Sequence, residues 1–305
     1  MNPRLPVFWP NTRPKPLPTK RNAPSSPFEK RVKRRITGRP HTFFAACPPG
    51  LVRLCQKEIS TLTNRITHFV PNPPNIIDIK TLAGGIEFTS RLDTACLAAL
   101  FLGTPVRLLM RIARFKADNF SKLEKELNTI DWKLFLPKAC TPEIRVTTRK
   151  SKLYHSDAIA ERCTNVIAKT LNLISRETTL PDPFPQTLMV RADHDRFELS
   201  LDLSGTPLFK RGIKQKVIQA PLRENLAFAI LTRLKLTPRD ILVDPMCGSG
   251  AFSLEAAIEV SRSVRESSRK RLALPRAGRR TKAEKTVPAM PPATETAYKR
   301  PTVAP

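Results

Sequence analysis

The sequence predicts an α+β protein that passes into an α/β segment near its C-terminal end, with disordered basic termini. Three observations lead to this prediction. Apolar patterns typical of strands and of helices alternate along residues 41–212. A glycine-rich turn stands between an apolar strand pattern and an apolar helix pattern within residues 241–258. Both ends of the chain, residues 1–40 and 261–305, are basic and show no apolar periodicity.

The charge of the chain is concentrated at its ends. The formal net charge of the 305 residues is +27. Residues 1–40 contain eleven Lys or Arg, one acid and nine prolines, and residues 261–305 contain twelve Lys or Arg and three acids. Basic chain ends of this kind usually bind a polyanion. RNA is the first candidate because each neutralised phosphate releases counterions. A solvated tail without a partner is the alternative.

Residues 41–115 are expected to form the first folded unit. Their patterns follow the order β-α-β-β-α-β, which is that of a small split α/β sandwich. Strand patterns lie at 43–47, 76–79, 86–88 and 106–112, and helix patterns at 51–62 and 92–102. The segment Val70–Asn75 contains three prolines and is predicted as a loop.

Residues 116–214 are expected to form a second unit. A helix face is predicted over 120–130 and an alternating strand over 144–148. Ser156 is predicted to cap a helix whose apolar stripe extends to Ile174. Two alternating runs, 188–192 and 197–203, are joined by Asp-His-Asp-Arg, which predicts a hairpin.

A third unit is expected over residues 218–260. A helix should begin at Pro221, because proline is favoured at the first helical position. Its predicted apolar face is Leu222, Leu226, Ile230, Leu231 and Leu234. A buried strand is predicted at 241–243 and a helix at 251–258.

The turn between that strand and that helix reads Asp244-Pro245-Met246-Cys247-Gly248-Ser249-Gly250. This is the context of a nucleotide-cofactor turn, since the glycines admit a ligand close to the backbone and the helix offers free N–H groups. Gly250 is not followed by the third glycine of a dinucleotide-binding turn, nor by the Gly-Lys-Ser/Thr sequence of a phosphate-binding loop. Neither of these two sites is therefore predicted. Taken alone, the turn is equally compatible with a tight structural turn.

The wider string resembles a known family. LVDPMCGSGAFSLEAA, preceded by APLRENLAFAIL, resembles motif I and its leading helix in RNA methylases that carry a THUMP domain. The resemblance is strongest to bacterial enzymes that methylate guanine N2 in 23S ribosomal RNA. FFAACPPGL, GGIEF, RVTTRKSKLYHSDAIAERC and LSLDLSGTPLFKRG occur upstream in the order expected for that family.

The resemblance implies a domain order and a cofactor. Residues 41–115 would be a ferredoxin-like lead-in, 116–214 a THUMP-like RNA-binding domain, and 218–260 only the start of a class I (Rossmann-like) methyltransferase domain. The implied cofactor is S-adenosylmethionine, and the implied partner is ribosomal RNA. The residues that would line the cofactor are Asp244, Pro245, Cys247, Gly248, Ser249 and Gly250. Ala251 stands where the family more often has threonine.

Basic residues of the THUMP-like part are candidates for phosphate contacts that recognise RNA shape. They cluster after the strand at 144–148 and near residue 212. The candidates are Arg145, Arg149, Lys150, Lys152, His155, Lys210, Arg211 and Lys214. An ordinary solvated basic face is the alternative. His155 is interpreted as structural or as a phosphate donor rather than as a general base.

The catalytic half of the implied enzyme is expected to be missing. By the resemblance, a ribose-binding acid and an Asn-Pro-Pro-aromatic motif should follow Gly250, and neither can be placed there. Asn72-Pro73-Pro74 is followed by Asn75 and lies in the wrong domain. No catalytic residue is therefore assigned, and the chain alone is predicted to be inactive. Truncation, a frameshift near Val260 or a split gene would each fit. A stand-alone THUMP-type RNA-binding protein without enzymatic activity is the alternative.

Other classes of site are not expected. The six cysteines form no C-x-x-C pair and no Cys/His ligand spacing, so neither a metal site nor a disulfide framework is predicted. No apolar run reaches about 18 residues, so no membrane span is predicted. Cytoplasmic localisation is the expectation.

Overall fold

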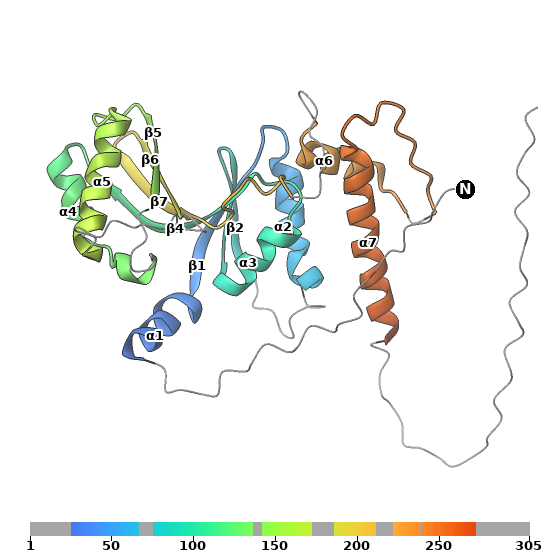
Figure 1. Cartoon of the computed structure of the whole chain (residues 1–305), viewed down its shortest axis with the longest axis horizontal. Coiled ribbons are helices and arrows are strands. Elements are labelled where there is room, and N and C mark those ends of the chain that lie inside the picture. The colour runs from blue at the N-terminus through green and yellow to red at the C-terminus, as the bar shows by residue number, and fades with distance from the viewer. Residues whose placement is uncertain are drawn as a thin grey trace, which may run out of the picture.

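A single seven-stranded sheet runs through the protein (Figure 1). The computed structural model describes residues 26–66, 76–136, 142–172, 186–211, 222–237 and 239–272, with side chains up to residue 261. The order of the strands is β2-β3-β1-β4-β7-β6-β5, and all neighbours are antiparallel except β5 and β6. The strands are β1 (Pro40–Ala46), β2 (Ile77–Leu82), β3 (Gly85–Arg91), β4 (Arg107–Lys116), β5 (Glu143–Arg149), β6 (Thr187–Asp193) and β7 (Arg196–Asp202).

The first four strands and helices α2 (Val52–Ile66) and α3 (Leu92–Phe101) form the first unit. Phe43 of β1 and Phe88 of β3 are directly opposite in the sheet and lie in one core, where their rings stack at 5.7 Å. The sequence prediction of a β-α-β-β-α-β unit is confirmed, and the strand order is that of a split α/β sandwich. The predicted loop at 70–75 lies outside the described residues.

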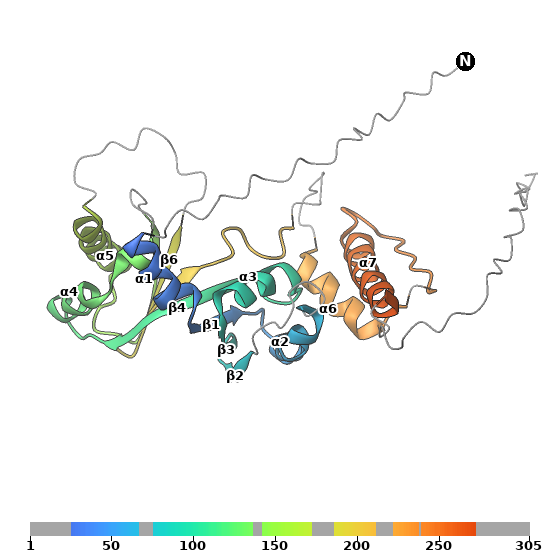
Figure 2. The same cartoon turned by 90° about the horizontal axis from the view of Figure 1, so that it is seen from below.

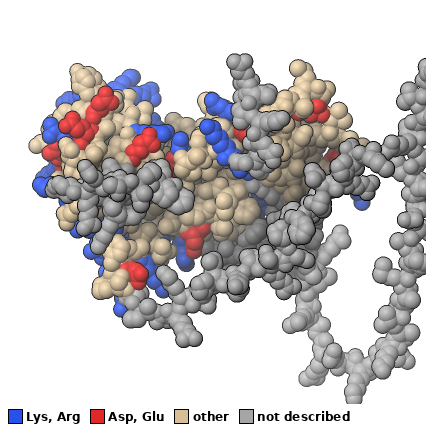
Figure 3. Space-filling model, in the orientation of Figure 1, with Lys and Arg blue, Asp and Glu red and all other residues tan. Residues whose placement is uncertain are grey.

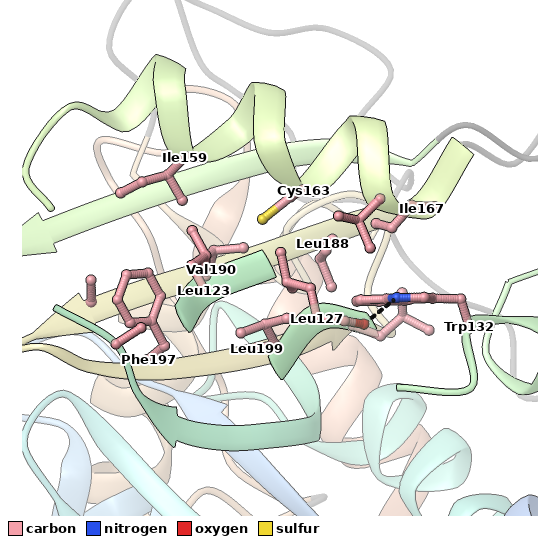
Figure 4. Packing of buried hydrophobic residues seen from close by; sticks show 14 of the residues in the cluster. Leu123, Leu127, Trp132, Ile159, Cys163, Ile167, Leu188, Val190, Phe197 and Leu199 are labelled. Carbon is pink, nitrogen blue, oxygen red and sulfur yellow. Dashed lines mark hydrogen bonds between the residues drawn. The ribbon is translucent and has the colours of Figure 1, made fainter. Parts of the chain in front are cut away.

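The second unit contains β5–β7, α4 (Phe120–Thr129), η2 (Trp132–Leu134) and α5 (Ser156–Leu171). Figure 4 shows α5 lying across the strands and closing a core of leucine, isoleucine and aromatic side chains. The indole Nε1 of the fully buried Trp132 donates to the carbonyl oxygen of Leu127 at 3.0 Å, which satisfies its polar atom inside the core. The predicted strands and hairpin are confirmed.

Strand β4 joins the two units. Its first half pairs with β1, and most of its length pairs with β7, from Leu109↔Asp202 to Lys116↔Arg196. The register shifts between Arg111 and Ala113, so one extra residue reverses the alternation of side chains. As a result, core residues before and after the bulge face the same side, and all four helices of the two units cover that one side of the sheet. Among the described residues, no helix of these two units lies on the other side, which is called the helix-free side.

Two expectations about the termini are wrong in part. Residues 27–32 form α1, and residues 33–37 form the π-helical turn η1, within the stretch that was expected to be disordered. Ser26 and Glu29 make a reciprocal capping box, which favours a helix at this point. Helix α7 (Ala251–Leu272) likewise extends past residue 261, because neither glycine nor proline interrupts it before Leu272. Residues 1–25 and 273–305 lie outside the described residues.

The predicted cap of α5 is also wrong. His155 is the N-cap residue, and no side chain caps this end. Ser156 is instead the first helical residue, with Asp157 beside it in the first turn. The predicted stripe is confirmed from Ile159 to Ile167, whereas Ile174 lies outside the described residues.

Helices α6 (Glu224–Leu234) and α7 lie together beside the first unit, at the end of the molecule opposite β5 (Figures 1 and 2). α6 buries Ala227, Phe228 and Leu231, whereas Ile230 and Leu234 of the predicted face are exposed. Phe228 can be buried here because Gly103 leaves room for its ring: a Cβ on Gly103 would lie 2.6 Å from the ring atoms. The predicted helix start at Pro221 lies outside the described residues.

A buried carboxylate organises this junction. Glu58 of α2 accepts hydrogen bonds from the backbone N–H groups of Gly103 and Thr104, at 2.8 and 2.9 Å. Asn225 of α6 donates to the carbonyl oxygen of Thr104 from a fully buried position. Burial raises the pKa of Glu58, and the bonds to this turn lower it by less. Glu58 therefore fixes the turn against which α6 packs.

The predicted strand at 241–243 does not form. These residues have no strand partner among the described residues, and Ile241 and Val243 are 90% and 76% exposed. A parallel strand of an α/β fold needs neighbours on both edges and cover on both faces, and none of the seven strands pairs with this segment. In the part of the chain that is described, no helix is long and apolar enough to cross a bilayer.

Replacement of Glu58 by glutamine should destabilise the fold by about 1–3 kcal/mol, because an amide offers one acceptor oxygen to two buried N–H donors. Since the folded pKa of Glu58 is raised above its usual 4.5, wild-type stability contributed by this group is full below that pH and falls as pH rises through the folded pKa. Urea unfolding from pH 4 to 8 should show this fall in the wild type and not in Glu58→Gln. Glu161→Gln, on an exposed position of α5, is the control and should unfold as the wild type does.

Candidate functional site

The turn Asp244–Gly250 leads directly into the N-terminus of α7. The backbone N–H of Met246 donates to Asp244 Oδ1 at 3.2 Å, and the N–H of Gly250 donates to the carbonyl oxygen of Cys247 at 2.7 Å. The N–H of Leu254 then donates to the carbonyl oxygen of Gly250, which begins the helix. Two successive turns thus hold the segment, and α7 begins at its end, where the first N–H groups of a helix have no partner within the helix.

Both glycines of the turn adopt a backbone conformation that favours glycine. Gly248 has φ of 50° and Gly250 has φ of 73°, values that residues with a Cβ rarely adopt. A Cβ on Gly250 would meet nothing closer than Leu254 Cγ at 4.0 Å. Packing within the described residues therefore does not select glycine at position 250.

The predicted cofactor residues share an open surface. Pro245, Cys247 and Gly248 are exposed, and Asp244, Ser249 and Gly250 are partly buried. Cys247 is a free thiol. The segment is therefore accessible to a small molecule, with one carboxylate, one hydroxyl and several backbone N–H groups available as polar contacts.

A second group of predicted site residues lies at the end of β5 and in the loop after it. Arg145 and Arg149 lie on the helix-free side of this edge strand, and Lys150, Lys152 and His155 are exposed in the loop. Arg145 donates two hydrogen bonds to Glu143, which raise the pKa of the arginine and lower that of the glutamate. Figure 3 shows that basic and acidic side chains are interspersed on the face in view.

The loop after β5 is fixed by the β6–β7 hairpin. His194 N–H donates to the carbonyl oxygen of Arg149 at 3.0 Å, and Lys152 N–H donates to Asp195 Oδ1 at 2.6 Å. Asp195 N–H in turn donates to Ser151 Oγ at 3.0 Å. His194 and Asp195 both have positive φ, as a tight two-residue hairpin turn requires. The basic loop is therefore held in place before any ligand arrives.

The remaining candidates do not join this cluster. Lys210 is exposed near the start of the connection to α6, and Lys214 lies outside the described residues. The guanidinium of Arg211 pairs with Glu255 of α7 at 3.0 Å, and the two side chains are 13% and 1% exposed. Arg211 thus connects the end of the second unit to the helix that follows the glycine-rich turn.

The sequence prediction missed a network of charged residues on the helix-free side of the sheet. Arg111 and Arg114 both pair with Glu87 of β3 and Glu198 of β7. Burial lowers the pKa of Arg111, and its guanidinium also lies over the ring of Phe44 at 4.5 Å. Exposed cations surround this network at Lys116, Arg191 and Arg196. Alternation along β4 gave a signal for Arg111, but only the bulge brings Arg114 to the same side.

Comparison with known proteins places the chain near RNA methyltransferases. Residues 211–294 match the RMKL-like methyltransferase domain family. The chain is 32% identical over 225 residues to a ribosomal RNA large subunit methyltransferase K/L of Syntrophotalea carbinolica, which covers 72% of this chain and 30% of that protein. The corresponding protein of Methylococcus capsulatus is 31% identical over 222 residues, 71% of this chain and 28% of its own. The chain therefore spans about 30% of the length of these relatives.

Solved structures share the fold. A Listeria monocytogenes protein described as a predicted N6-adenine-specific DNA methylase superposes with a TM-score of 0.62 at 24% identity, over 73% of this chain and 56% of that chain. A protein assigned as a methyltransferase and solved in complex with SAH superposes with a TM-score of 0.57 at 26% identity, over 72% and 56% of the two chains. The mixed α/β fold with a mostly antiparallel sheet is thus one that methyltransferases contain.

Loss of the Arg211 cation should loosen α7. In Arg211→Met the buried Glu255 carboxylate loses its guanidinium, a change that costs about 3–5 kcal/mol in buried pairs. Amide hydrogen exchange over residues 251–261 should accelerate, while exchange in β1–β4 should stay unchanged. Arg162→Met is the matched control, because its pair with Glu124 is half exposed and should contribute little. Unchanged exchange in α7 of Arg211→Met would show that this pair does not hold the helix.

Proposed function

We propose that this chain is the RNA-binding part, with the first cofactor-binding turn, of an S-adenosylmethionine-dependent ribosomal RNA (guanine-N2) methyltransferase. One observation carries the proposal: similarity to ribosomal RNA methyltransferases covers about 70% of the chain, far more than the segment around the turn. The same chain combines a fixed basic loop with a glycine-rich turn at a helix N-terminus. These are the two parts that an RNA-modifying enzyme of this kind needs.

Three domains are proposed on this basis. Residues 41–115 form a ferredoxin-like lead-in, residues 116–214 a THUMP domain, and residues 218–260 the start of the methyltransferase domain. The shared sheet supports a rigid arrangement of the first two, and the junction around Glu58 supports docking of the third. The catalytic groups are proposed to lie outside these residues.

The RNA contacts are assigned to the second unit. Arg149, Lys150 and Lys152 present cations from a loop that three hydrogen bonds to the β6–β7 hairpin already fix. A rigid row of cations recognises the spacing of phosphates and reads the shape of RNA rather than its bases. Arg145 and His155 extend this surface. Lys210 and Lys214 are proposed as further RNA contacts apart from this loop, whereas Arg211 is assigned to holding α7.

The glycine-rich turn fits the methionine and ribose end of S-adenosylmethionine. Gly248 and Gly250 place no side chain at the turn, and the first N–H groups of α7 suit a carboxylate. Asp244, Pro245, Cys247 and Ser249 complete the proposed contact set. The solved relative in complex with SAH, the demethylated form of this cofactor, supports the assignment. When bound, the cofactor supplies a sulfonium methyl group.

Transfer to a guanine amine depends on holding that amine in line with the methyl group, so most of the rate enhancement comes from positioning. Within the described residues the site offers one glycine-rich turn and no second strand end beside it. One turn leaves most of a cofactor in water. We therefore propose weak cofactor binding and no turnover by this chain alone.

RNA binding should show a steep dependence on salt. When a protein neutralises several phosphates, the logarithm of its affinity for RNA falls linearly with the logarithm of the salt concentration. The slope is about −0.9 for each phosphate contact. Arg149→Glu with Lys152→Glu should weaken binding of structured ribosomal RNA about tenfold or more. Filter binding or fluorescence anisotropy from 50 to 300 mM KCl measures both effects. An affinity that is independent of salt and unaffected by these changes would refute the RNA assignment.

The cofactor assignment has a separate test. Isothermal titration should detect weak S-adenosylmethionine binding to the wild-type chain and none to Gly250→Val, which a positive φ disfavours. No tritium should pass from labelled cofactor to undermethylated ribosomal RNA. Robust turnover that Asp244→Ala abolishes would show instead that the chain holds a complete active site. Intact RNA binding with no cofactor binding would favour a stand-alone RNA-binding protein.

A further inference from the structure

We propose that the helix-free side of the sheet contains a second RNA-binding site, a cavity that binds backbone phosphates through Lys116 and Arg196. This inference rests on the proposed function only in that the chain binds RNA. The basic loop after β5 supplies the first site, and the cavity lies on different strands.

The cavity is the concave side of the curved sheet. Its volume is about 560 Å³, and it is open to solvent. Leu82 of β2 and Arg191 of β6 both line it, although four strands separate β2 from β6 in the sheet order. The sheet must therefore bend toward its helix-free side. The lining residues are Phe44, Leu82, Ala83, Arg111, Lys116, Arg191, Asp193, His194, Arg196 and Glu198.

The floor of the cavity is rigid. Arg111 is 10% exposed, stacks on Phe44 and pairs with Glu87 and Glu198. Arg114 pairs with the same two carboxylates, so the two arginines and two glutamates form a closed network. These carboxylates are already engaged and cannot neutralise further cations at the rim. The network thus fixes the shape of the cavity and leaves the rim positive.

Two cations at the rim face each other without a counterion. Lys116 and Arg196 are directly opposite in the β4–β7 register, on the helix-free side. Neither has an ion-pair partner among the described residues. Like charges directly opposite on neighbouring strands destabilise a sheet. An anion bound between them would remove that cost.

The acids near the rim do not cancel this pair. Asp193 lies opposite Arg196 on β6, but its carboxylate bonds to His194 and Arg191, and the bond from His194 lowers its pKa. The lining as a whole holds four Lys or Arg side chains against two carboxylates. A phosphate oxygen fits this setting because it accepts several hydrogen bonds from Lys and Arg at once.

RNA suits the cavity better than a free phosphate or an acidic protein. The cavity is several times larger than one phosphate, is open to solvent and is lined by residues from β2 to β6, so a continuous backbone can pass through it. The β6–β7 hairpin that carries Arg196 also fixes the basic loop after β5. A strand of phosphates can therefore contact the loop and continue into the cavity.

The test reverses the two unpaired cations. Lys116→Glu with Arg196→Glu should weaken binding of structured ribosomal RNA about tenfold and reduce the salt slope by about two, because two phosphate contacts are lost. Lys125→Glu with Lys169→Glu is the matched control, since both lysines are exposed on helices α4 and α5 and the charge change is the same. The control should keep most of the affinity and slope of the wild type.

A neutral variant separates binding from folding. Lys116→Gln with Arg196→Gln removes the like-charge repulsion, so its thermal midpoint should be at least that of the wild type while RNA binding still weakens. If both rim variants bind RNA as the control does, while Arg149→Glu with Lys152→Glu is defective, the cavity assignment is wrong and the proposed function stands. If none of these variants differs from the wild type, RNA binding itself is misassigned. Loss of poly-glutamate binding with unchanged RNA affinity would overturn the assignment in favour of an acidic protein partner.

Discussion

The pairing of β4 with both β1 and β7 is the constraint from which the arrangement of the protein follows. A ten-residue strand is long enough to be an inner strand of both units, so two small cores share one sheet. The bulge between Arg111 and Ala113 keeps both cores on the same side of that sheet. Without the extra residue, the second core would require its helices on the opposite side. The helix-free side and its charged network exist only because the bulge is there.

The elements that the sequence predicted correctly are those whose signals are local. The apolar run from Phe43 to Cys47 and the helical spacing from Leu51 to Leu62 depend on residues that touch the same core. The predicted face of α6 is confirmed only at Leu231, because burial there also depends on a distant glycine, Gly103, which admits Phe228. The segment 241–243 was predicted as a strand from its apolar residues, yet a strand exists only where neighbours pair with it. The capping box at Ser26 was readable in the sequence and was missed.

In the candidate site, too, the features that depend on local sequence were predictable and those that depend on tertiary packing were not. The turn Asp244–Gly250 was predictable, because glycine readily adopts the positive φ that Gly248 and Gly250 have in the structure. The pairing of Arg211 with Glu255 was not, because it depends on how α7 docks. Arg111 and Arg114 are three positions apart and would point to opposite sides of a regular strand. Their common network with Glu87 and Glu198 could be found only once the bulge was known.

The glycine-rich turn and the basic loop lie at opposite ends of the molecule (Figure 1). α6 and α7 pack beside the first unit, whereas the loop extends from β5 at the far edge of the sheet. On the proposed function, an RNA held at the loop must extend along the molecule to bring a base near the turn. Among the described residues, helices of the two units cover one side of the sheet, so the route that these helices leave open is the concave side, past Lys116 and Arg196. The rigid sheet would then set the distance between the point where RNA is held and the point where its base meets the cofactor. A change in the bulge of β4 would alter that distance without touching either site.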